Sequence, residues 1–202
     1  TLDEMKLFAL IDQQAGSLDE AGLSRRCERT IPGTDAQGTP HARRAVERYR
    51  ELRAARGAAT APPASWLASE TDRVSRYPAM QLAAIQRRQH ENVYAYLFTW
   101  PSPYQGGRLG ACHALDIPFV FGTHTMPVLH AFTGTGPAAD AFAERIQDAW
   151  IAFARTGRPA HAGLGTWPAY DAERRRTMLL GHEWGVVEGP YEGECRFWEC
   201  IA

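Results

Sequence analysis

An eight-residue apolar run, Val93–Trp100, limits what this chain can fold into more than any other feature. Apolar and aromatic residues occupy both alternating faces of the run, which is typical of a sheet strand covered by layers on both sides. Helical patterns precede and follow it, so we predict an α/β fold in which this run is a central strand. The run also disfavours a freestanding helical interaction module, because such a strand needs neighbouring strands.

A histidine motif follows the predicted strand, after a loop rich in proline and glycine. The motif extends from Gly110 to Gly122 and places His113 after three small residues and before an acid, a proline and an apolar run. In α/β proteins, the loops beyond the carboxyl ends of the strands carry catalytic and ligand-binding groups. We therefore interpret His113 as a catalytic general base.

Length and composition exclude several classes of protein. The 202 residues suffice for one domain or slightly more, and 45% of them are hydrophobic. A net charge of −1 argues against nucleic acid or an acidic membrane surface as a partner. No apolar run reaches the ~20 residues of a membrane span. The chain begins at Thr1 rather than Met, so we expect its original N-terminus to be missing, and the lack of a visible signal peptide carries no conclusion.

The cysteine pattern matches neither a zinc site nor a disulfide framework. Free thiols are typical of a reducing compartment, so we expect a cytoplasmic protein. A bridge between the last two cysteines stays open as an alternative. The four cysteines are Cys27, Cys112, Cys195 and Cys200.

Apolar periodicity and capping signals predict most of the secondary structure. Ser17 and Glu20 form a capping box, Pro78 should kink the helix that contains it, and Gly157 should end the last long helix. The predicted helices lie at residues 3–11, 17–29, 40–56, 65–89 and 137–156, with short strands at 177–180 and 186–187. The core positions predicted within 65–89 are Trp66, Val74, Tyr77, Leu82 and Ile85.

The arginine-rich helix at residues 40–56 invites a nucleic-acid interpretation. Glu47 and Glu51 interrupt the row of arginines, and a solvated helix face accounts for the pattern. The helix therefore gives no evidence for a nucleic-acid partner.

Hydrolysis of an ester by a serine needs a base, an acid that orients the base, and donors that stabilise the oxyanion. Hydrolase folds present the serine in Gly-x-Ser-x-Gly, ahead of the acid and the histidine. That motif is missing from this sequence. The serines, all without the flanking glycines, are Ser17, Ser24, Ser65, Ser69, Ser75 and Ser102.

Two segments resemble motifs of the type-B carboxylesterases, the para-nitrobenzyl esterase and cholinesterase-like family of α/β-hydrolases. Thr1–Phe8 is similar to the acid motif of that family, with Met5 in place of the usual glycine. Gly110–Gly122 is similar to its histidine motif. The resemblance implies ester hydrolysis through an acyl-enzyme, with Glu4 as the triad acid, His113 as the base and no cofactor.

Further segments extend the resemblance over nearly the whole chain: Thr71–Arg73, Tyr94–Phe98, Trp150–Pro159 and Trp167–Tyr170. It implies a C-terminal portion of an α/β-hydrolase, helix-rich, with the last strands of the central sheet. The implied parts are an acid loop and helix (1–16), a helical region (17–90) and the last core strand with the histidine loop, C-terminal helix and edge strands (91–202). The serine-bearing N-terminal part would be the partner, and the chain alone would be inactive. The alternative is a hydrolase-fold binding or adhesion protein without activity.

Other residues remain candidates at the site. Asp3 adjoins Glu4 and could be the acid that points inward, and Asp116 could orient His113 or cap the turn after it. Cys112 could pair with His113, although neighbouring side chains in an extended loop point apart. The remaining histidines show no recognisable spacing for a metal, and three phenylalanines could line an acyl pocket or belong to the core. These residues are His124, His130, His161 and His182, and Phe98, Phe119 and Phe121.

Overall fold

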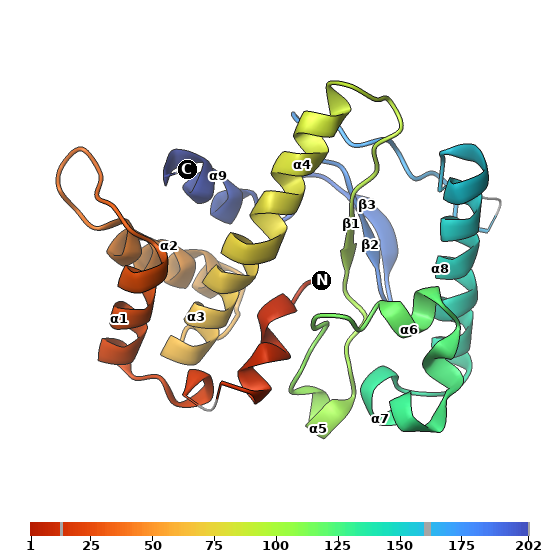
Figure 1. Cartoon of the computed structure of the whole chain (residues 1–202), viewed down its shortest axis with the longest axis horizontal. Coiled ribbons are helices and arrows are strands. Elements are labelled where there is room, and N and C mark those ends of the chain that lie inside the picture. Colours follow the sequence, from red (N-terminus) through yellow and green to blue (C-terminus); the bar gives the residue numbers. More distant parts are fainter. Residues whose placement is uncertain (13, 160–162, 202) are drawn as a thin grey trace. The chain divides into compact units, whose positions relative to one another are not determined.

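The computed structural model describes residues 1–12, 14–159 and 163–201, which form two compact units (Figure 1). The first unit combines residues 1–6 with 79–190, and the second combines residues 7–78 with 191–202. Glu4 and His113 therefore belong to the same unit. The division predicted from sequence, at residues 1–16, 17–90 and 91–202, stays a prediction.

The first unit contains a three-stranded sheet in the order β1-β2-β3. Strand β1 (Tyr96–Phe98) pairs in parallel with β2 (Thr177–Leu180), with Leu97 opposite Leu179. Strand β3 (Trp184–Val187) pairs antiparallel with β2 and lies at the edge, with Met178 opposite Val186. The predicted hairpin is thus confirmed within the described sheet, although its second strand begins at Trp184 rather than at Val186.

The strand predicted at residues 93–100 is shorter than expected. Only three of its residues form β1, although the flanking backbone still bonds to β2. The Met178 N–H donates to the Ala95 carbonyl at 3.0 Å, and the Thr99 N–H donates to Leu180 at 2.7 Å. Pro101 has no N–H with which to continue the ladder. Among the described residues β1 has one neighbouring strand, so its central position stays a prediction.

Helix α8 (Pro137–Thr156) has the bounds expected from the sequence. Pro137 occupies the first turn, where its missing N–H costs nothing. At the other end, Gly157 adopts a left-handed conformation and donates its N–H to the Phe153 carbonyl at 2.7 Å. These two signals and the apolar residues at helical spacing define the helix without tertiary information.

An aromatic cluster forms the core between α8 and the strands. Phe142 of α8 stacks on Trp100 with 4.8 Å between ring centroids, and meets Phe119 edge-on at 4.9 Å. It also contacts Phe98 at the end of β1 and Trp184 of β3. The cluster fixes the segment after β1 against α8, and this segment carries the histidine motif.

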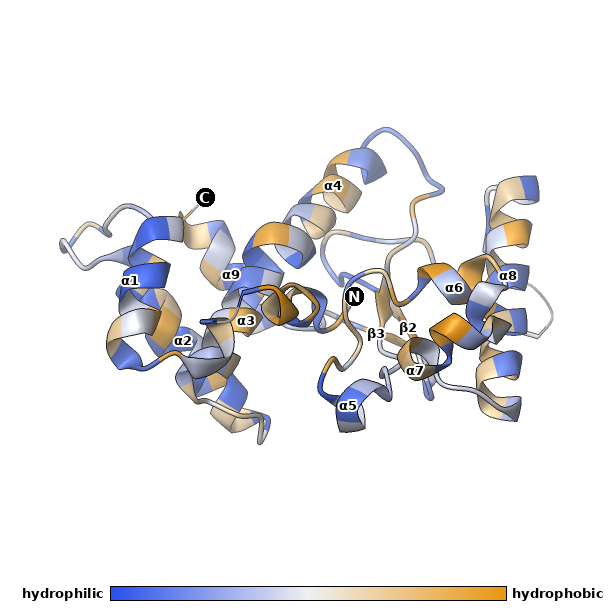
Figure 2. Cartoon of the chain, turned by 60° about the horizontal axis from the view of Figure 1, so that its bottom comes forward, coloured by the Kyte–Doolittle hydropathy of each residue, from blue (hydrophilic) through white to orange (hydrophobic). Residues whose placement is uncertain are grey.

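Short helices connect β1 to α8. They are α5 (Tyr104–Gly107), α6 (Ile117–Val120), the 3-10 turns η5 (Thr123–Thr125) and η6 (Pro127–Leu129), and α7 (His130–Thr133). Helix α6 follows the histidine and is apolar (Figure 2). Helix α4 (Tyr77–Arg87) precedes β1 and spans the boundary of the two units.

The second unit is helical, with α1 (Glu20–Thr30), α2 (His41–Ala55), α3 (Pro62–Thr71) and α9 (Glu192–Ile201) around one core. Its buried side chains include Leu23, Tyr49, Trp66 and Trp198. The tail that contains Phe197 and Trp198 docks on this core, as predicted.

One predicted helix start and one predicted helix were wrong. Asp19, not Ser17, caps α1, because its carboxylate accepts the Gly22 N–H at 2.6 Å; Ser17 ends a preceding 3-10 turn, η3 (Ala15–Ser17). The helix predicted at 3–11 is replaced by two 3-10 turns, η1 (Glu4–Lys6) and η2 (Phe8–Leu10). The N–H groups of Leu2 and Asp3 donate instead to Phe98 and Ala111.

The core prediction within residues 65–89 holds only in part. Trp66 and Tyr77 are buried, but Val74, Leu82 and Ile85 are 50%, 59% and 58% exposed. A π-helical turn, η4 (Asp72–Arg76), precedes Pro78, and the Tyr77 N–H donates to the carbonyl of Asp72. Val74 lies within this wider turn. Leu82 and Ile85 follow Tyr77 in α4 and lie about 140° and 80° around the helix axis from it, away from the buried face.

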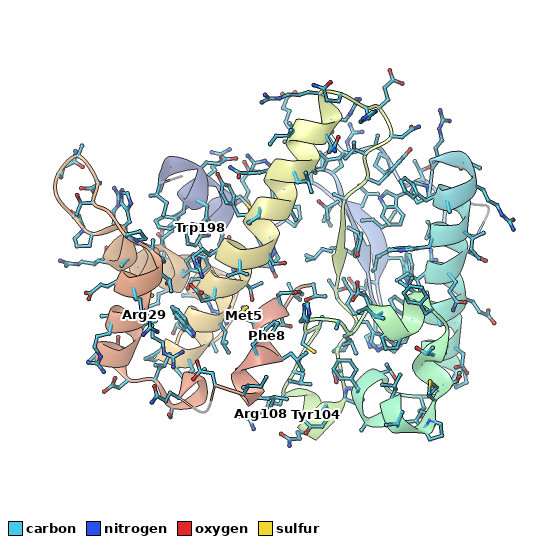
Figure 3. All side chains as sticks on the ribbon, in the orientation of Figure 1. Met5, Phe8, Arg29, Tyr104, Arg108 and Trp198 are labelled. Carbon is cyan, nitrogen blue, oxygen red and sulfur yellow. The ribbon has the colours of Figure 1, made fainter. Side chains whose placement is uncertain are left out.

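A buried polar network joins three elements of the second unit. The Tyr49 hydroxyl donates to Asp72 at 2.6 Å and accepts the Trp198 indole N–H at 2.7 Å (Trp198 is labelled in Figure 3). Arg76 forms an ion pair with Asp72, and Arg56 forms one with the buried Glu194. The Asp72 segment of the family resemblance is therefore part of this unit's packing.

Candidate active site

Glu4 and His113 meet in the first unit. Oε1 of Glu4 contacts Nδ1 of His113, and the Glu4 carboxylate also accepts a hydrogen bond from the Thr1 hydroxyl. The His113 side chain is 47% exposed and that of Glu4 is 13% exposed. The acid is thus sheltered, while the imidazole reaches solvent.

Backbone hydrogen bonds hold the segment that carries Glu4 (the acid segment, residues 2–4) against β1 and against the loop that carries His113 (the histidine loop, residues 110–113). The Leu2 N–H donates to Phe98 at 3.0 Å, the Asp3 N–H to Ala111 at 2.9 Å, and the His113 N–H to the Glu4 carbonyl at 3.4 Å. Three successive residues of the acid segment therefore form backbone hydrogen bonds with β1 and with the histidine loop. This pairing sets the register in which Glu4 faces His113.

Asp3 points to a different partner from Glu4. Its Oδ2 accepts the Ala111 N–H at 3.1 Å, and its Oδ1 forms an ion pair with Lys6 at 2.9 Å. Of the two adjacent acids, Glu4 is the one that contacts the imidazole.

A left-handed residue follows His113. Ala114 has φ +63°, an uncommon conformation for a residue with a Cβ. The chain turns here, so that Cys112 and Leu115 are buried on either side of the exposed His113. Strained backbone of this kind clusters at functional sites.

The electrostatics of the site keep Glu4 ionised. Burial by itself would raise the pKa of the Glu4 carboxylate. The hydrogen bonds from the Thr1 hydroxyl and from His113 lower it, and the pKa lies below the ordinary value. An ionised carboxylate at this position favours a proton on Nδ1 of His113 and leaves Nε2 as the basic nitrogen.

Cys112 is unsuited to act as the nucleophile. Its side chain is fully buried, and burial raises the pKa of the thiol to about 11. A protonated, inaccessible thiol is inert. The Cys–His alternative is thus disfavoured by the geometry and the protonation state together.

Asp116 has its own partner. The Tyr96 hydroxyl donates to its Oδ2 at 3.4 Å, and burial, followed by the Asp116 charge, raises the pKa of Tyr96 to about 12. Asp116 occupies the N-cap position of α6, but its side chain makes no capping hydrogen bond there. Sequence patterns gave no sign of the Tyr96 contact.

The histidines considered as metal ligands have other contacts. His124 stacks on Phe119 and contacts Asp140, His130 contacts the Thr125 carbonyl, and His182 packs on Trp100. His161 lies outside the described residues. Within residues 1–12, 14–159 and 163–201, no group of three or more His, Cys, Asp or Glu side chains could hold a metal ion.

The three phenylalanines have different environments. Phe98 and Phe119 are fully buried core residues, whereas Phe121 is 74% exposed. Of the two roles considered for Phe121, a core role is wrong, because the short helix α6 ends there and the chain turns at Gly122, which has φ +67°. Phe121 instead lines a cavity of about 430 Å³ together with Tyr96, Asp116, Ile117 and Trp150.

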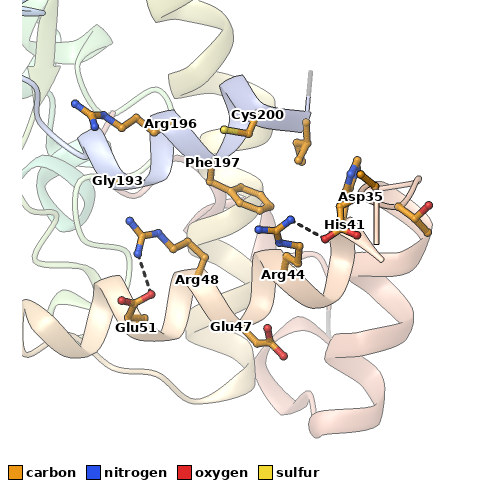
Figure 4. Close-up of a pocket in the computed structure, with 13 residues that line it drawn as sticks. Asp35, His41, Arg44, Glu47, Arg48, Glu51, Gly193, Arg196, Phe197 and Cys200 are labelled. Atoms are coloured by element: carbon orange, nitrogen blue, oxygen red, sulfur yellow. Dashed lines mark hydrogen bonds and ion pairs between the residues drawn. The ribbon is translucent and has the colours of Figure 1, made fainter. Parts of the chain in front are cut away.

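A larger cavity lies within the second unit (Figure 4). It has a volume of about 850 Å³ and is lined by residues of α2, of α9 and of the loop before α2. Arg44 pairs with Asp35 at 2.7 Å, Arg48 with Glu51 at 2.8 Å, and Arg196 with Glu192 at 2.8 Å. Its arginines are thus neutralised by local acids, and its lining contains none of the residues predicted for catalysis.

In the part of the chain that the structure describes, every helix is too short or too polar to span a lipid bilayer.

Two hydrolases are similar in sequence to part of this chain. The chain is 34% identical over 120 residues to the para-nitrobenzyl esterase of Bacillus subtilis (strain 168), which covers 59% of the chain and 24% of that protein. It is 35% identical over 106 residues to the phenmedipham hydrolase of Pseudarthrobacter oxydans, which covers 52% of the chain and 22% of that protein.

Structural similarity extends further along the chain. The crystal structure of a carboxylesterase from Geobacillus stearothermophilus superposes with a TM-score of 0.78 and 32% identity, over 97% of this chain and 38% of that one. The chain matches about a quarter of the length of the two sequence relatives. Its fold corresponds to a portion of an α/β-hydrolase, helix-rich and with a small part of the sheet.

The sequence model of the carboxylesterase family matches residues 3–198, nearly the whole chain. The segment that it covers includes both the acid and the histidine of the candidate site. This chain belongs to the carboxylesterase family.

Proposed function

We propose that this chain is part of a serine esterase, in which Glu4 and His113 are the acid and the base of the catalytic triad. The observation that carries the proposal is the contact between Oε1 of Glu4 and Nδ1 of His113, two residues that are distant in sequence. An ionised acid, a histidine oriented by it and an exposed imidazole are what a triad needs before a serine is added.

The nucleophile would be a serine from a part of the protein outside these 202 residues. The serine hydroxyl loses its proton to Nε2 of His113 as its oxygen attacks the carbonyl carbon of the ester. Glu4 holds the Nδ1 proton and stabilises the imidazolium ion that forms. The imidazolium then protonates the leaving alcohol, which leaves an acyl group on the serine.

Deacylation repeats the same proton transfers with water in place of the serine. His113 accepts a proton from water, the resulting hydroxide attacks the acyl-enzyme, and the serine recovers its proton from the imidazolium. Neither acylation nor deacylation requires a cofactor. The substrate class is carboxylic esters, which is supported by the similarity to a para-nitrobenzyl esterase and to a carboxylesterase.

The experiment uses the complete enzyme and p-nitrophenyl butyrate. Acid quenching within the first turnovers should trap a butyryl group on one serine, identified by mass spectrometry of the digest. An enzyme that hydrolyses the ester without a serine adduct at any quench time, or that fails to hydrolyse it, contradicts the proposal.

A further inference from the structure

Asp3 and Ala111 form two hydrogen bonds with each other. The Asp3 N–H donates to the Ala111 carbonyl at 2.9 Å, and Oδ2 of Asp3 accepts the Ala111 N–H at 3.1 Å. We propose that Asp3 is a positioning residue of the esterase site, which fixes the histidine loop on the acid segment. The inference rests on the proposed function, since it assigns Asp3 a role in aligning Glu4 and His113.

The Asp3 carboxylate occupies the space that a side chain at position 110 would fill. A Cβ at position 110 would lie 2.2 Å from Oδ2 and 2.8 Å from Cγ of Asp3. Gly110 also has φ +55°, which a side chain would disfavour. A larger residue at 110 must therefore displace the carboxylate and strain the backbone together.

The environment makes the Asp3 bond hard to replace. Ala111 is 1% exposed, so water cannot readily satisfy its N–H once the carboxylate is gone. The other oxygen of Asp3 is held by Lys6 at 2.9 Å, which restrains the carboxylate in this orientation. Lys6 is 37% exposed, so its ion pair adds less than the buried bond to Ala111.

The link to the site is short. Glu4 follows Asp3 directly, and His113 is two residues beyond Ala111. A shift of the loop against the acid segment therefore changes the Glu4–His113 contact itself. Misplacement of a catalytic group by about 1 Å can lower the rate by about 100-fold.

The test compares Asp3→Ala, Asp3→Asn and the control Asp148→Ala in the complete enzyme. Asp148 is an exposed acid on α8 of the same unit. Asp3→Ala should lower kcat by about 100-fold and leave KM within about threefold, because the loop shifts while the substrate surface stays. Asp3→Asn should keep kcat within about fivefold, since the amide oxygen can still accept the Ala111 N–H. The control should keep the activity of the unsubstituted enzyme.

A double-mutant cycle tests the mutual fit of Asp3 and Gly110. Gly110→Ala should lower kcat strongly in the unsubstituted enzyme and much less in the Asp3→Ala background, where the clash partner is gone. Additive effects overturn the proposal, as does normal kcat for Asp3→Ala. Asp3→Asn, nearly isosteric, keeps the proposal testable if Asp3→Ala does not fold: a loss of kcat in a folded Asp3→Asn overturns the role as acceptor.

A His113→Ala variant in the same series separates the two proposals. If His113→Ala retains activity, the proposed function fails. If it is inactive while Asp3→Ala is normal, only the positioning role fails.

Discussion

Glu4 and His113 are in contact although they are 109 positions apart in the sequence. The two residues are brought together by the bonding of the acid segment to the end of β1 and to the histidine loop. The contact between the two side chains thus depends on this backbone pairing. Changes in the pairing should affect catalysis as directly as changes in the two side chains.

The two adjacent acids should differ in their effect on catalysis. Glu4→Gln should lower kcat by about 10⁴-fold, because only this acid orients the imidazole and stabilises its charge. Asp3→Asn should have a far smaller effect, since Asp3 contacts Ala111 and Lys6. Steady-state kinetics on a p-nitrophenyl ester distinguish them. The reverse ranking would transfer the triad role to Asp3, and equal mild effects would assign the acid elsewhere.

Substitutions at Ala114 should report on the left-handed turn after His113. Ala114→Gly should change the free energy of unfolding by less than about 1 kcal/mol, since relief of strain is offset by the freer unfolded chain. Ala114→Val should destabilise by about 1–3 kcal/mol, because a β-branched residue tolerates φ +63° poorly. Urea denaturation measures both values. Equal stability of the two variants would show that the turn is unstrained.

Removal of the Tyr49 hydroxyl should weaken the second unit. Tyr49→Phe takes the hydrogen-bond partner from Asp72 and from the indole of Trp198, both of which are buried. We expect a loss of about 1–3 kcal/mol in the free energy of unfolding. Tyr94→Phe, at a partly exposed tyrosine of the other unit, is the control and should change the stability by less than about 0.5 kcal/mol. A Tyr49 variant no less stable than its control would contradict this account of the network.

The lowered pKa of Glu4 predicts a pH dependence of stability. Because the pKa is lower in the folded protein than the ordinary 4.5, the ionised carboxylate stabilises the fold above about pH 4.5, and this contribution is lost as the pH falls through the folded-state pKa. The difference in unfolding free energy between the unsubstituted protein and Glu4→Gln should therefore be constant near neutral pH and shrink in acid. Urea titrations across this range measure it, and a difference that is the same at both ends would show that Glu4 is not stabilised by its contacts.

Some parts of this structure could be predicted from sequence because local signals determined them. Pro137 and Gly157 delimit α8, and the histidine motif follows the apolar strand at a recognisable spacing. The buried face of residues 65–89 could not be derived, because both faces of α4 carry apolar residues and only Tyr77 of those predicted there is covered.

Within the site, the sequence predicted His113 as the base and, by resemblance, Glu4 as the acid, with Asp3 as the alternative acid. Adjacent acids can be told apart only by which way each side chain points, and that direction depends on pairing with distant residues. The glycine at position 110 was the available signal for Asp3, since a residue without a Cβ indicates a close approach, but the sequence does not say which group approaches.

Labelling with a fluorophosphonate probe tests most directly whether Glu4 and His113 serve a serine elsewhere in the protein. In the complete enzyme the probe should modify one serine, located by mass spectrometry outside residues 1–202. His113→Ala should slow that reaction by several orders of magnitude, because the base that activates the serine is gone. The 202-residue chain alone should not be labelled. Stoichiometric labelling of a serine within these residues, or a labelling rate that His113→Ala leaves unchanged, would contradict the account.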